Sequence, residues 1–231
     1  MKMQRISDHI WSLKTWIIIP IHVWVVVDVD GVVLVDAGIS GMANGILKGI
    51  DSLNAGPLQK ILLTHGHSDH VGSVNKIVNN RSVPVYAHKI ELSYINGELP
   101  YPRRKKSEPH VRKGTVQPLN QDKQGVLESI AGLKPYLTPG HAPGHVVYYH
   151  EQDQVLLAGD LFTSRNGKLR RPMPMFTADM AEALKSSTIV KQLAPVRIEV
   201  CHGEPVLKPA EQVDEYIRET SVAFSLSIPF K

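Results

Sequence analysis

Cysteine is nearly absent from the sequence, with one residue, Cys201, in 231. A single thiol excludes a disulfide within the chain, so nothing in the composition requires an oxidising compartment. Long apolar runs are also missing, because the most apolar stretch, residues 16–27, is interrupted by Pro20 and His22. That stretch is shorter than the roughly 20 residues that a membrane span needs, and residues 1–11 lack a signal-peptide pattern. We therefore expect a soluble cytoplasmic protein without membrane contact.

A large excess of one charge is lacking as well, since the net charge is +4. This mildly basic balance suits an anionic substrate but gives only weak support for nucleic-acid binding. Hydrophobic residues make up 42% and charged residues 21% of the chain, which is ordinary for a soluble globular protein. The length fits one domain, residues 1–231, whose core needs no disulfides.

Short strands alternate with helices along the chain. Two β-branched runs, residues 17–28 and 32–36, flank Val29-Asp30-Gly31, and Asp-Gly favours a hairpin. Residues 96–114, rich in proline and basic side chains, form the one linker-like region. Strands and helices in both halves indicate an α/β layered domain. Further expected strands are 61–64, 83–87, 126–130, 133–137, 145–149, 155–158 and 196–201, and the expected helices are 42–54, 71–79, 178–192 and 209–220.

Residues 65–70 spell H-x-H-x-D-H directly after an apolar strand. In an extended segment every second side chain faces the same way, so His65, His67 and Asp69 can converge. His70 starts the next helix and approaches from another direction. Four ligand-type residues within six positions crowd one tetrahedral ion, and two adjacent ions fit better. Because four positions are fixed, an accidental match is rare.

Three later segments supply further ligand types. His141 lies in a turn-rich loop after a strand, and His202 follows an apolar strand and precedes Gly203. Asp160 ends the apolar run 155–159, where a buried carboxylate is costly unless it is paired or binds metal. Ligands at the ends of several strands form a rigid site that stays open to substrate.

With these residues the chain resembles the metallo-β-lactamase superfamily. The resemblance spans nearly the whole chain and implies a four-layer αββα sandwich, in which two mixed β-sheets carry helices on their outer faces and the metals lie at one edge. It implies that Asp69 and Asp160 are catalytic, that Asp160 bridges two metal ions, and that Asp36 supports the ligand loop. The family motifs appear in order as Val35-Asp36-Ala37-Gly38, His65 to His70, His141, Asp160 and His202. The implied ligands are His65, His67 and His141 for the first metal, and Asp69, His70 and His202 for the second.

This resemblance implies a metal-dependent hydrolase. Water bound to such metals can have a pKa near about 7, so a bridging hydroxide can attack at neutral pH without a serine or cysteine nucleophile. Zinc suits the histidine-rich set, and iron or manganese fits the same ligands. The favoured substrate is a small-molecule ester, thioester or lactone, and the basic net charge is compatible with an anionic one. The alternatives are a phosphodiesterase or ribonuclease of the same fold and a non-hydrolytic di-iron redox protein.

The subgroups of the family differ in features that can be checked here. Lactonase members carry a tyrosine three positions after the bridging aspartate, where this chain has Thr163. Glutathione thioesterases bind glutathione through a helical region after the last histidine. Residues 203–231 have room for only one helix, which argues against that activity. Zinc β-lactamases alter the ligand set found in residues 65–70. Nuclease relatives add an RNA-binding insertion, and residues 96–114 are too few to form one. The sequence sets neither the substrate nor the oligomeric state.

Other residues near the motifs carry weaker expectations. We expect His145 to support the site through a hydrogen bond, and Cys201 to be a buried thiol that points away from His202 because side chains alternate along a strand. The basic residues 103–106 and 165–171 form either solvated loops or a lid for an acidic substrate, and Lys168 loosely matches a glutathione-binding position. Residues 171–176 either line an apolar pocket or pack under a helix. The remaining histidines, expected not to bind metal, are His9, His22, His88, His110 and His150.

Overall fold

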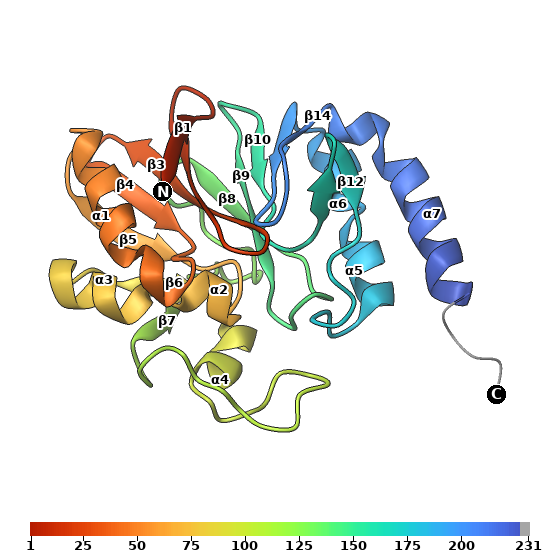
Figure 1. Ribbon diagram of the computed structural model, residues 1–231, viewed down its shortest axis with the longest axis horizontal. Coiled ribbons are helices and arrows are strands. Elements are labelled where there is room, and N and C mark those ends of the chain that lie inside the picture. The colour runs from red at the N-terminus through yellow and green to blue at the C-terminus, as the bar shows by residue number, and fades with distance from the viewer. Residues whose placement is uncertain (227–231) are drawn as a thin grey trace.

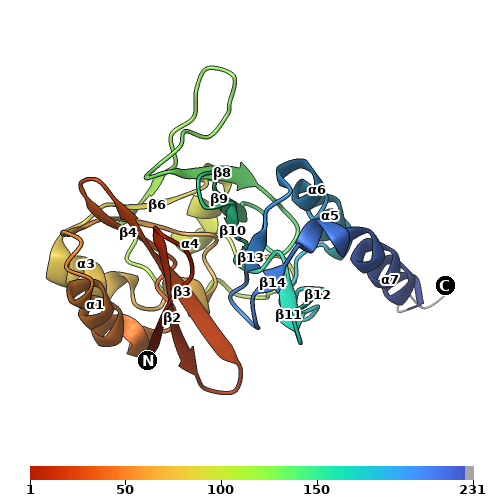
Figure 2. The same cartoon turned by 90° about the horizontal axis from the view of Figure 1, so that it is seen from above.

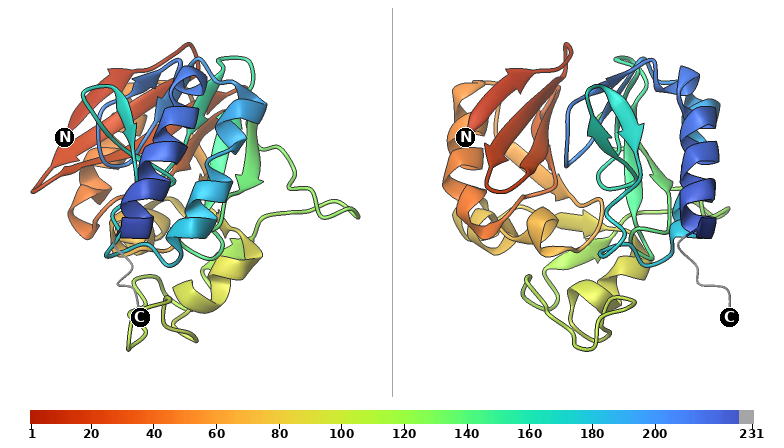
Figure 3. Two further views of the ribbon diagram at one scale, coloured as in Figure 1. Left: turned by 90° about the vertical axis from the view of Figure 1, so that its right-hand side faces the viewer. Right: turned by 45° about the vertical axis from the view of Figure 1, so that its right-hand side comes forward.

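The computed structural model describes residues 1–226 of the chain. Two β-sheets lie face to face, and helices cover the outer face of each sheet (Figure 1). In the right-hand view of Figure 3 the layers run helix, sheet, sheet, helix. Both sheets contain parallel and antiparallel pairs. The predicted αββα sandwich with two mixed sheets is confirmed.

The first sheet has seven strands that lie in chain order. Pairing is antiparallel up to the fourth strand and parallel from there onward. Helices α1 (Ala43–Ser52) and α3 (Val74–Arg81) lie on its outer face (Figure 1). Its strands are β1 (Lys2–Arg5), β2 (Ile10–Trp16), β3 (Pro20–Asp28), β4 (Gly31–Val35), β5 (Leu58–Leu62), β6 (Val85–Ala87) and β7 (Val116–Pro118).

The second sheet has five strands in the order β14-β13-β10-β9-β8. These are β8 (Leu133–Leu137), β9 (Val146–His150), β10 (Val155–Leu157), β13 (Arg197–Glu199) and β14 (Val206–Leu207). Helices α5 (Met180–Ser186), α6 (Ile189–Leu193) and α7 (Val213–Leu226) lie on its side of the molecule (Figure 1). The remaining elements are α2 (Ser68–Val71), α4 (Leu92–Ile95), the hairpin of β11 (Thr163–Arg165) and β12 (Lys168–Arg170), and three short 3₁₀ helices at Ser40–Met42, Lys89–Glu91 and Pro209–Glu211.

Strand β9 shows how the layers are held together. Its residues Val146 and Tyr148 belong to the apolar core shared by the two sheets, whereas Val147 and Tyr149 pack in the core under helices α6 and α7. Successive side chains of a strand point to opposite faces, so a strand between two cores is apolar throughout. The hydroxyl of Tyr148 donates a hydrogen bond to the carbonyl of Leu63 (2.9 Å), which fixes the second sheet against the segment that carries the first ligands.

Most predicted elements are present with shifted ends, but two predicted helices are divided. The helix expected over 71–79 is divided into α2 and α3 around Ser73, whose hydroxyl donates to the carbonyl of Ile39 (2.6 Å). The helix expected over 178–192 is divided into α5 and α6. There Ser187 and Thr188 donate to carbonyls three residues earlier, a local bond that competes with helix continuation.

The strand predicted over 126–130 is wrong. This segment is part of a loop between β7 and β8 that projects from the sandwich (Figure 2). The carboxylate of Asp122 accepts hydrogen bonds from the backbone N–H groups of Gln124 and Val126. These bonds stabilise a local turn, and the N–H groups are then not available for pairing with another strand. Within the described residues, no helix has the length and apolar character needed to cross a membrane.

Candidate metal centre

The seven predicted ligands come together at one edge of the sandwich. The segment after β5 carries the first two histidines, and α2 carries the next aspartate and histidine. The other three residues follow strands β8, β10 and β13 of the second sheet. The structure therefore brings together both halves of the chain at His65, His67, Asp69, His70, His141, Asp160 and His202.

The potential ligands at this edge form two main groups. Within each group, all ligand atoms lie within 4.8 Å of one another. The first contains His65, His67 and His141, with Nδ1 of His67 3.0 Å from Nε2 of His141. The second contains Asp69, His70 and His202, where Nε2 of His202 lies 3.0 Å from Oδ2 of Asp69. These groups contain the residues that the family resemblance assigns to each metal, and the second group also contains Cys201. A further group, His65, His70 and Asp160, joins the two.

Asp160 lies between the two groups. Its Oδ2 is 3.3 Å from Nε2 of His141 and 3.5 Å from Nε2 of His202. Its Oδ1 is 3.4 Å from Nε2 of His70. One carboxylate thus contacts ligands of both groups, as a residue that bridges two cations must.

Several of these atoms are buried without a hydrogen-bond partner. They include Nε2 of His65, His70 and His202 and Oδ1 of Asp160. Buried polar atoms are nearly always paired, because an unpaired one loses its interaction with water and gains nothing. Four such atoms at one edge fit a metal-binding role, and imidazole nitrogen with carboxylate oxygen is a donor set that zinc, iron and manganese accept.

Asp36 orients His70 as expected. The Asp36 carboxylate accepts hydrogen bonds from the backbone N–H of Thr64 (2.8 Å), the Thr64 hydroxyl (2.8 Å) and Nδ1 of His70 (2.7 Å). Because Nδ1 of His70 donates there, its Nε2 is left as the nitrogen that faces the centre. The carbonyl of Pro20 holds Nδ1 of His202 in the same way (2.9 Å).

His145 also has the supporting contact that was predicted. Its Nε2 accepts a hydrogen bond from the backbone N–H of Asp160 (3.1 Å), and its Nδ1 lies 2.9 Å from the hydroxyl of Thr138. Burial lowers the pKa of His145 to about 3, so its ring is neutral and can accept. The contact fixes the backbone at the residue between the two ligand groups.

Glu91 is a supporting residue that sequence reasoning missed. Its buried carboxylate accepts hydrogen bonds from the backbone N–H of Gly144 (2.7 Å), the N–H of Gly66 (3.1 Å) and the hydroxyl of Tyr101 (2.5 Å). It therefore ties the ligand loop after β5 to the loop that holds His141. Burial raises the pKa of Glu91. A lone glutamate on a short 3₁₀ turn belongs to no motif that could have marked it.

The charges in the centre favour a cation. Burial lowers the pKa of His67 and of His141 to about 3, which leaves both rings neutral. Burial raises the pKa of Asp69, but His70 and His202 outweigh it and bring that pKa to about 2. Burial lowers the pKa of His202, but Asp160 and further negative neighbours raise it well above its usual value. Ionised carboxylates thus attract positive charge into a buried place.

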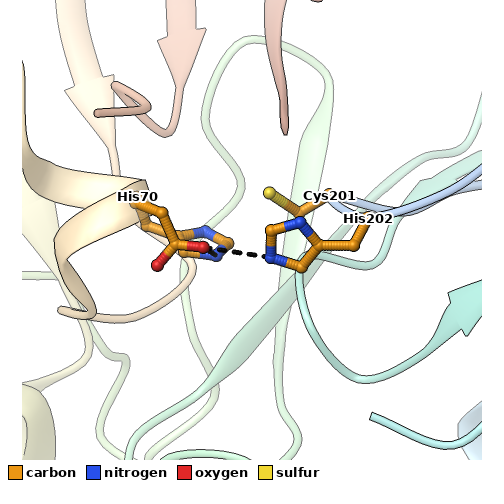
Figure 4. Close-up of side chains that lie close together, drawn as sticks. His70, Cys201 and His202 are labelled. Atoms are coloured by element: carbon orange, nitrogen blue, oxygen red, sulfur yellow. Dashed lines mark ion pairs between the residues drawn. The ribbon is translucent and has the colours of Figure 1, made fainter. Parts of the chain in front are cut away.

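The prediction that Cys201 points away from His202 is wrong. Its sulfur lies with the ligand atoms of Asp69, His70 and His202, all within 4.8 Å of one another, and Figure 4 shows it on the side of His202 that faces His70. The strand alternation behind the prediction does not apply, because β13 ends at Glu199 and the chain leaves the sheet before Cys201. The thiol is buried, as expected.

The centre opens into a cavity of about 230 Å³. Ile19, Met173 and Phe176 form its apolar wall, and Arg104 adds a positive charge beside His67 and Asp160. Residues 171–176 therefore contribute to the cavity wall, and the basic segment 103–106 reaches the mouth through Arg104.

An adjoining cavity of about 410 Å³ shares Ile19 and Met173 with the first and is lined by Lys14, Arg165 and His202. Of the second basic segment, Arg165 is the residue that lies beside the centre. Lys168, which loosely matches a glutathione-binding position, lines a separate cavity with Glu215 and Tyr216. The β11–β12 turn directs it toward helix α7 instead.

Comparisons with known proteins agree with this geometry. The sequence pattern of the Metallo-beta-lactamase superfamily matches residues 16–202. The probable metallo-hydrolase YybB of Bacillus subtilis (strain 168) is 40% identical over 221 residues, which cover 94% of this chain and 98% of that protein.

Two solved structures show the same fold. The metallo-beta-lactamase family protein TTHA1429 from Thermus thermophilus matches with a TM-score of 0.73 at 21% identity, over 94% of this chain and 81% of that one. A second structure, TTHA1623 in a di-iron-bound form, matches with a TM-score of 0.66 at 26% identity, over 87% of this chain and 96% of that one.

Proposed function

Because the chain belongs to the metallo-beta-lactamase superfamily, we propose that its histidine and aspartate cluster holds two divalent ions and hydrolyses a small carboxylic ester, thioester or lactone. Zinc is the proposed metal, since imidazole and carboxylate ligands suit it, although iron and manganese accept the same donors. The observation that carries the proposal is the position of Asp160, whose two oxygens lie between the two ligand groups.

The residues have separate tasks in this proposal. His65, His67 and His141 would hold one ion, Asp69, His70 and His202 the other, and Asp160 both. Bound divalent ions would make water nucleophilic at neutral pH and polarise a carbonyl. Asp36 keeps Nε2 of His70 directed at the centre, and His145 fixes the backbone of Asp160.

The cavity walls support the substrate class. The apolar side chains of Ile19, Met173 and Phe176 suit an acyl chain or ring, and Arg104 can pair with a negative group of the substrate. Arg165 and Lys14 extend the positive charge into the adjoining cavity. A small anionic molecule with an apolar portion is the substrate that this combination fits best.

A phosphodiester is the second candidate, because the same cations can hold phosphate. The two candidates are separated by a panel of thioesters, lactones, carboxylic esters and phosphodiesters, assayed with protein that has been stripped of metal and reloaded with zinc. We expect hydrolysis of a carboxylic derivative. Cleavage confined to phosphodiesters, with RNA binding that weakens steeply as salt rises, would favour the second candidate.

Replacing the bridging carboxylate tests the metal centre itself. Asp160→Ala is expected to lower the metal content from two ions per chain to one or none and to abolish hydrolysis of whichever panel substrate the native protein cleaves. Asp8→Ala is the matched control, since Asp8 is exposed and its carboxylate pairs with Arg5. Unchanged metal content and activity in Asp160→Ala would refute the bridging role.

A further inference from the structure

Cys201 is held in a fixed position at the edge of the metal centre. Its backbone N–H donates to the carbonyl of Gly159 (3.0 Å), and its carbonyl accepts from the N–H of His22 (3.2 Å). The side chain is fully buried. Two independent backbone bonds, one to each sheet's side of the core, therefore determine where the sulfur points.

The sulfur of Cys201 is surrounded by side chains that can bind a cation. Ligand atoms of Asp69, His70 and His202 lie within 4.8 Å of the sulfur, and Figure 4 shows the sulfur near the rings of His70 and His202. Nε2 of His70 is buried and makes no hydrogen bond. Nε2 of His202 also makes none of accepted geometry, but it forms an ion pair with Oδ2 of Asp69 at 3.0 Å. Both residues are at least nine-tenths buried. The buried Nε2 of His70 is an observation separate from the cysteine. Both histidines offer a ligand atom to the group that contains the sulfur of Cys201.

We propose that Cys201 supplies a sulfur ligand to the second metal ion, beside Asp69, His70 and His202. The inference rests on the proposed metal centre and adds to it a donor that the histidine and aspartate motif does not contain. The ordinary alternative is a small buried side chain that fills the core. Cys201 is a buried member of the core shared by the sheets, but core packing alone does not explain a sulfur grouped with three ligand atoms.

A sulfur donor makes the two metal sites chemically different. The first site has three imidazoles, whereas the second gains a soft ligand that favours zinc, cadmium or cobalt over manganese, which prefers oxygen donors. We therefore expect manganese to compete poorly with zinc for the second site. The first site should discriminate less between the two metals.

Cobalt(II) gives a direct spectroscopic test. A cobalt–thiolate bond produces a near-ultraviolet charge-transfer band, whereas cobalt bound by nitrogen and oxygen produces only weaker visible bands. The chain has a single cysteine, so a thiolate band in the native protein can come only from Cys201. Metal-free native protein titrated with cobalt should show visible bands for two ions per chain and a near-ultraviolet band that grows with one of them.

Cys201→Ser, which keeps the size of the side chain, should retain the visible bands and lose the near-ultraviolet band. Its affinity for the second ion should fall by about 10-fold or more, as for other changes to the surroundings of a bound metal. Cadmium-113 NMR of the native protein gives a second readout that needs no variant, because a sulfur ligand moves one of the two resonances strongly downfield.

The possible failures are distinguishable. Two cobalt ions bound to the native protein without a charge-transfer band would overturn the role of Cys201 and leave the metal centre intact. A charge-transfer band that persists in Cys201→Ser would overturn it as well. Native protein that binds no cobalt and no cadmium would overturn both this inference and the proposed metal centre.

Discussion

At the scale of single residues, three of the predicted histidine ligands have a polar contact on the side of the ring that faces away from the centre. Nδ1 of His70 donates to Asp36, Nδ1 of His202 to the carbonyl of Pro20, and Nδ1 of His141 lies 3.2 Å from the hydroxyl of Thr177. Such partners fix which ring nitrogen carries the proton and which faces the metal. The metal affinity of the centre therefore depends on residues that never touch the ion.

Asp36→Asn tests this dependence. Asp36 has a φ of 59°, a backbone conformation that asparagine tolerates, so the change removes the charge with little strain. If the amide oxygen stays on Thr64, the amide N–H₂ faces Nδ1 of His70 and favours the ring form with its proton on Nε2, inside the centre. We expect affinity for the second ion to fall by about 10- to 100-fold, measured by zinc competition with a chromophoric chelator.

The control for that substitution is Asp51→Asn, because Asp51 pairs with Arg81 at the surface, far from any predicted ligand. It should leave zinc affinity unchanged. Equal affinities for the native protein and Asp36→Asn, with both folded by circular dichroism, would show that Asp36 does not orient His70 in the way described.

Residue identity at the centre was predictable because the signal is local. Residues 65–70 contain four potential metal ligands, three histidines and one aspartate, within six positions. Asp160 and His202 each follow an apolar strand. Glu91 and the direction of Cys201 were not predictable. Both depend on the path of the backbone after a strand or through a loop, which residue spacing does not encode.

At the scale of elements, the join between α2 and α3 positions the ligands of α2. Gly72 lies at that join, and a Cβ there would meet Ser40 N at 2.6 Å and Ser68 O at 2.7 Å. Both contacts are backbone atoms, which cannot move aside as a flexible side chain can. The close approach of this glycine to residues 39–40 holds α2 against the segment that follows β4.

Gly72→Ala is therefore expected to destabilise the protein by about 1–3 kcal/mol through overpacking, measured as the free energy of unfolding in urea. Gly41→Ala is a close control, because a Cβ at Gly41 meets nothing within 4 Å. That change should be neutral or slightly stabilising. Equal stabilities of the two variants would mean that the backbone contact at Gly72 does not restrain α2.

The success of element prediction followed the strength of each pattern. The β-branched runs that form β3 and β4 were found, and so was β8, because apolar alternation and the Asp-Gly turn are strong signals. Strand β1 was missed because its residues are all exposed and lack alternation, and β14 because it has only two residues. The breaks within two predicted helices were missed because the helical spacing of apolar residues continues across a short break.

At the scale of the whole molecule, segments far apart in the chain form the walls of the cavity beside the centre. Ile19 comes from the turn between β2 and β3 of the first sheet, and Met173 and Phe176 come from the segment between β12 and α5. Arg103 holds that segment in place by donating to the carbonyls of Pro174 and Thr177 (2.7 and 2.9 Å). The basic segment 103–106 therefore shapes the mouth as well as charging it.

Arg104→Ala should raise the KM for an anionic substrate by about 5-fold, because one exposed charge pair contributes on the order of 1 kcal/mol, and leave kcat nearly unchanged. The measurement is steady-state kinetics on the best panel substrate and on its neutral analogue, which should be affected much less. Lys168→Ala serves as control, since Lys168 faces α7. A KM that rises equally for both substrates would indicate that Arg104 packs against the cavity without pairing with substrate.

The arrangement of the whole sandwich places ligands from both sheets around Asp160, and this is the claim on which the rest depends. Crystals of zinc-loaded protein, measured on both sides of the zinc absorption edge, test it most directly. Two anomalous peaks on either side of the Asp160 carboxylate, one against His65, His67 and His141 and one against Asp69, His70 and His202, are the predicted result. A map with no peak at this edge, or with a single peak that Asp160 does not contact, would contradict the account.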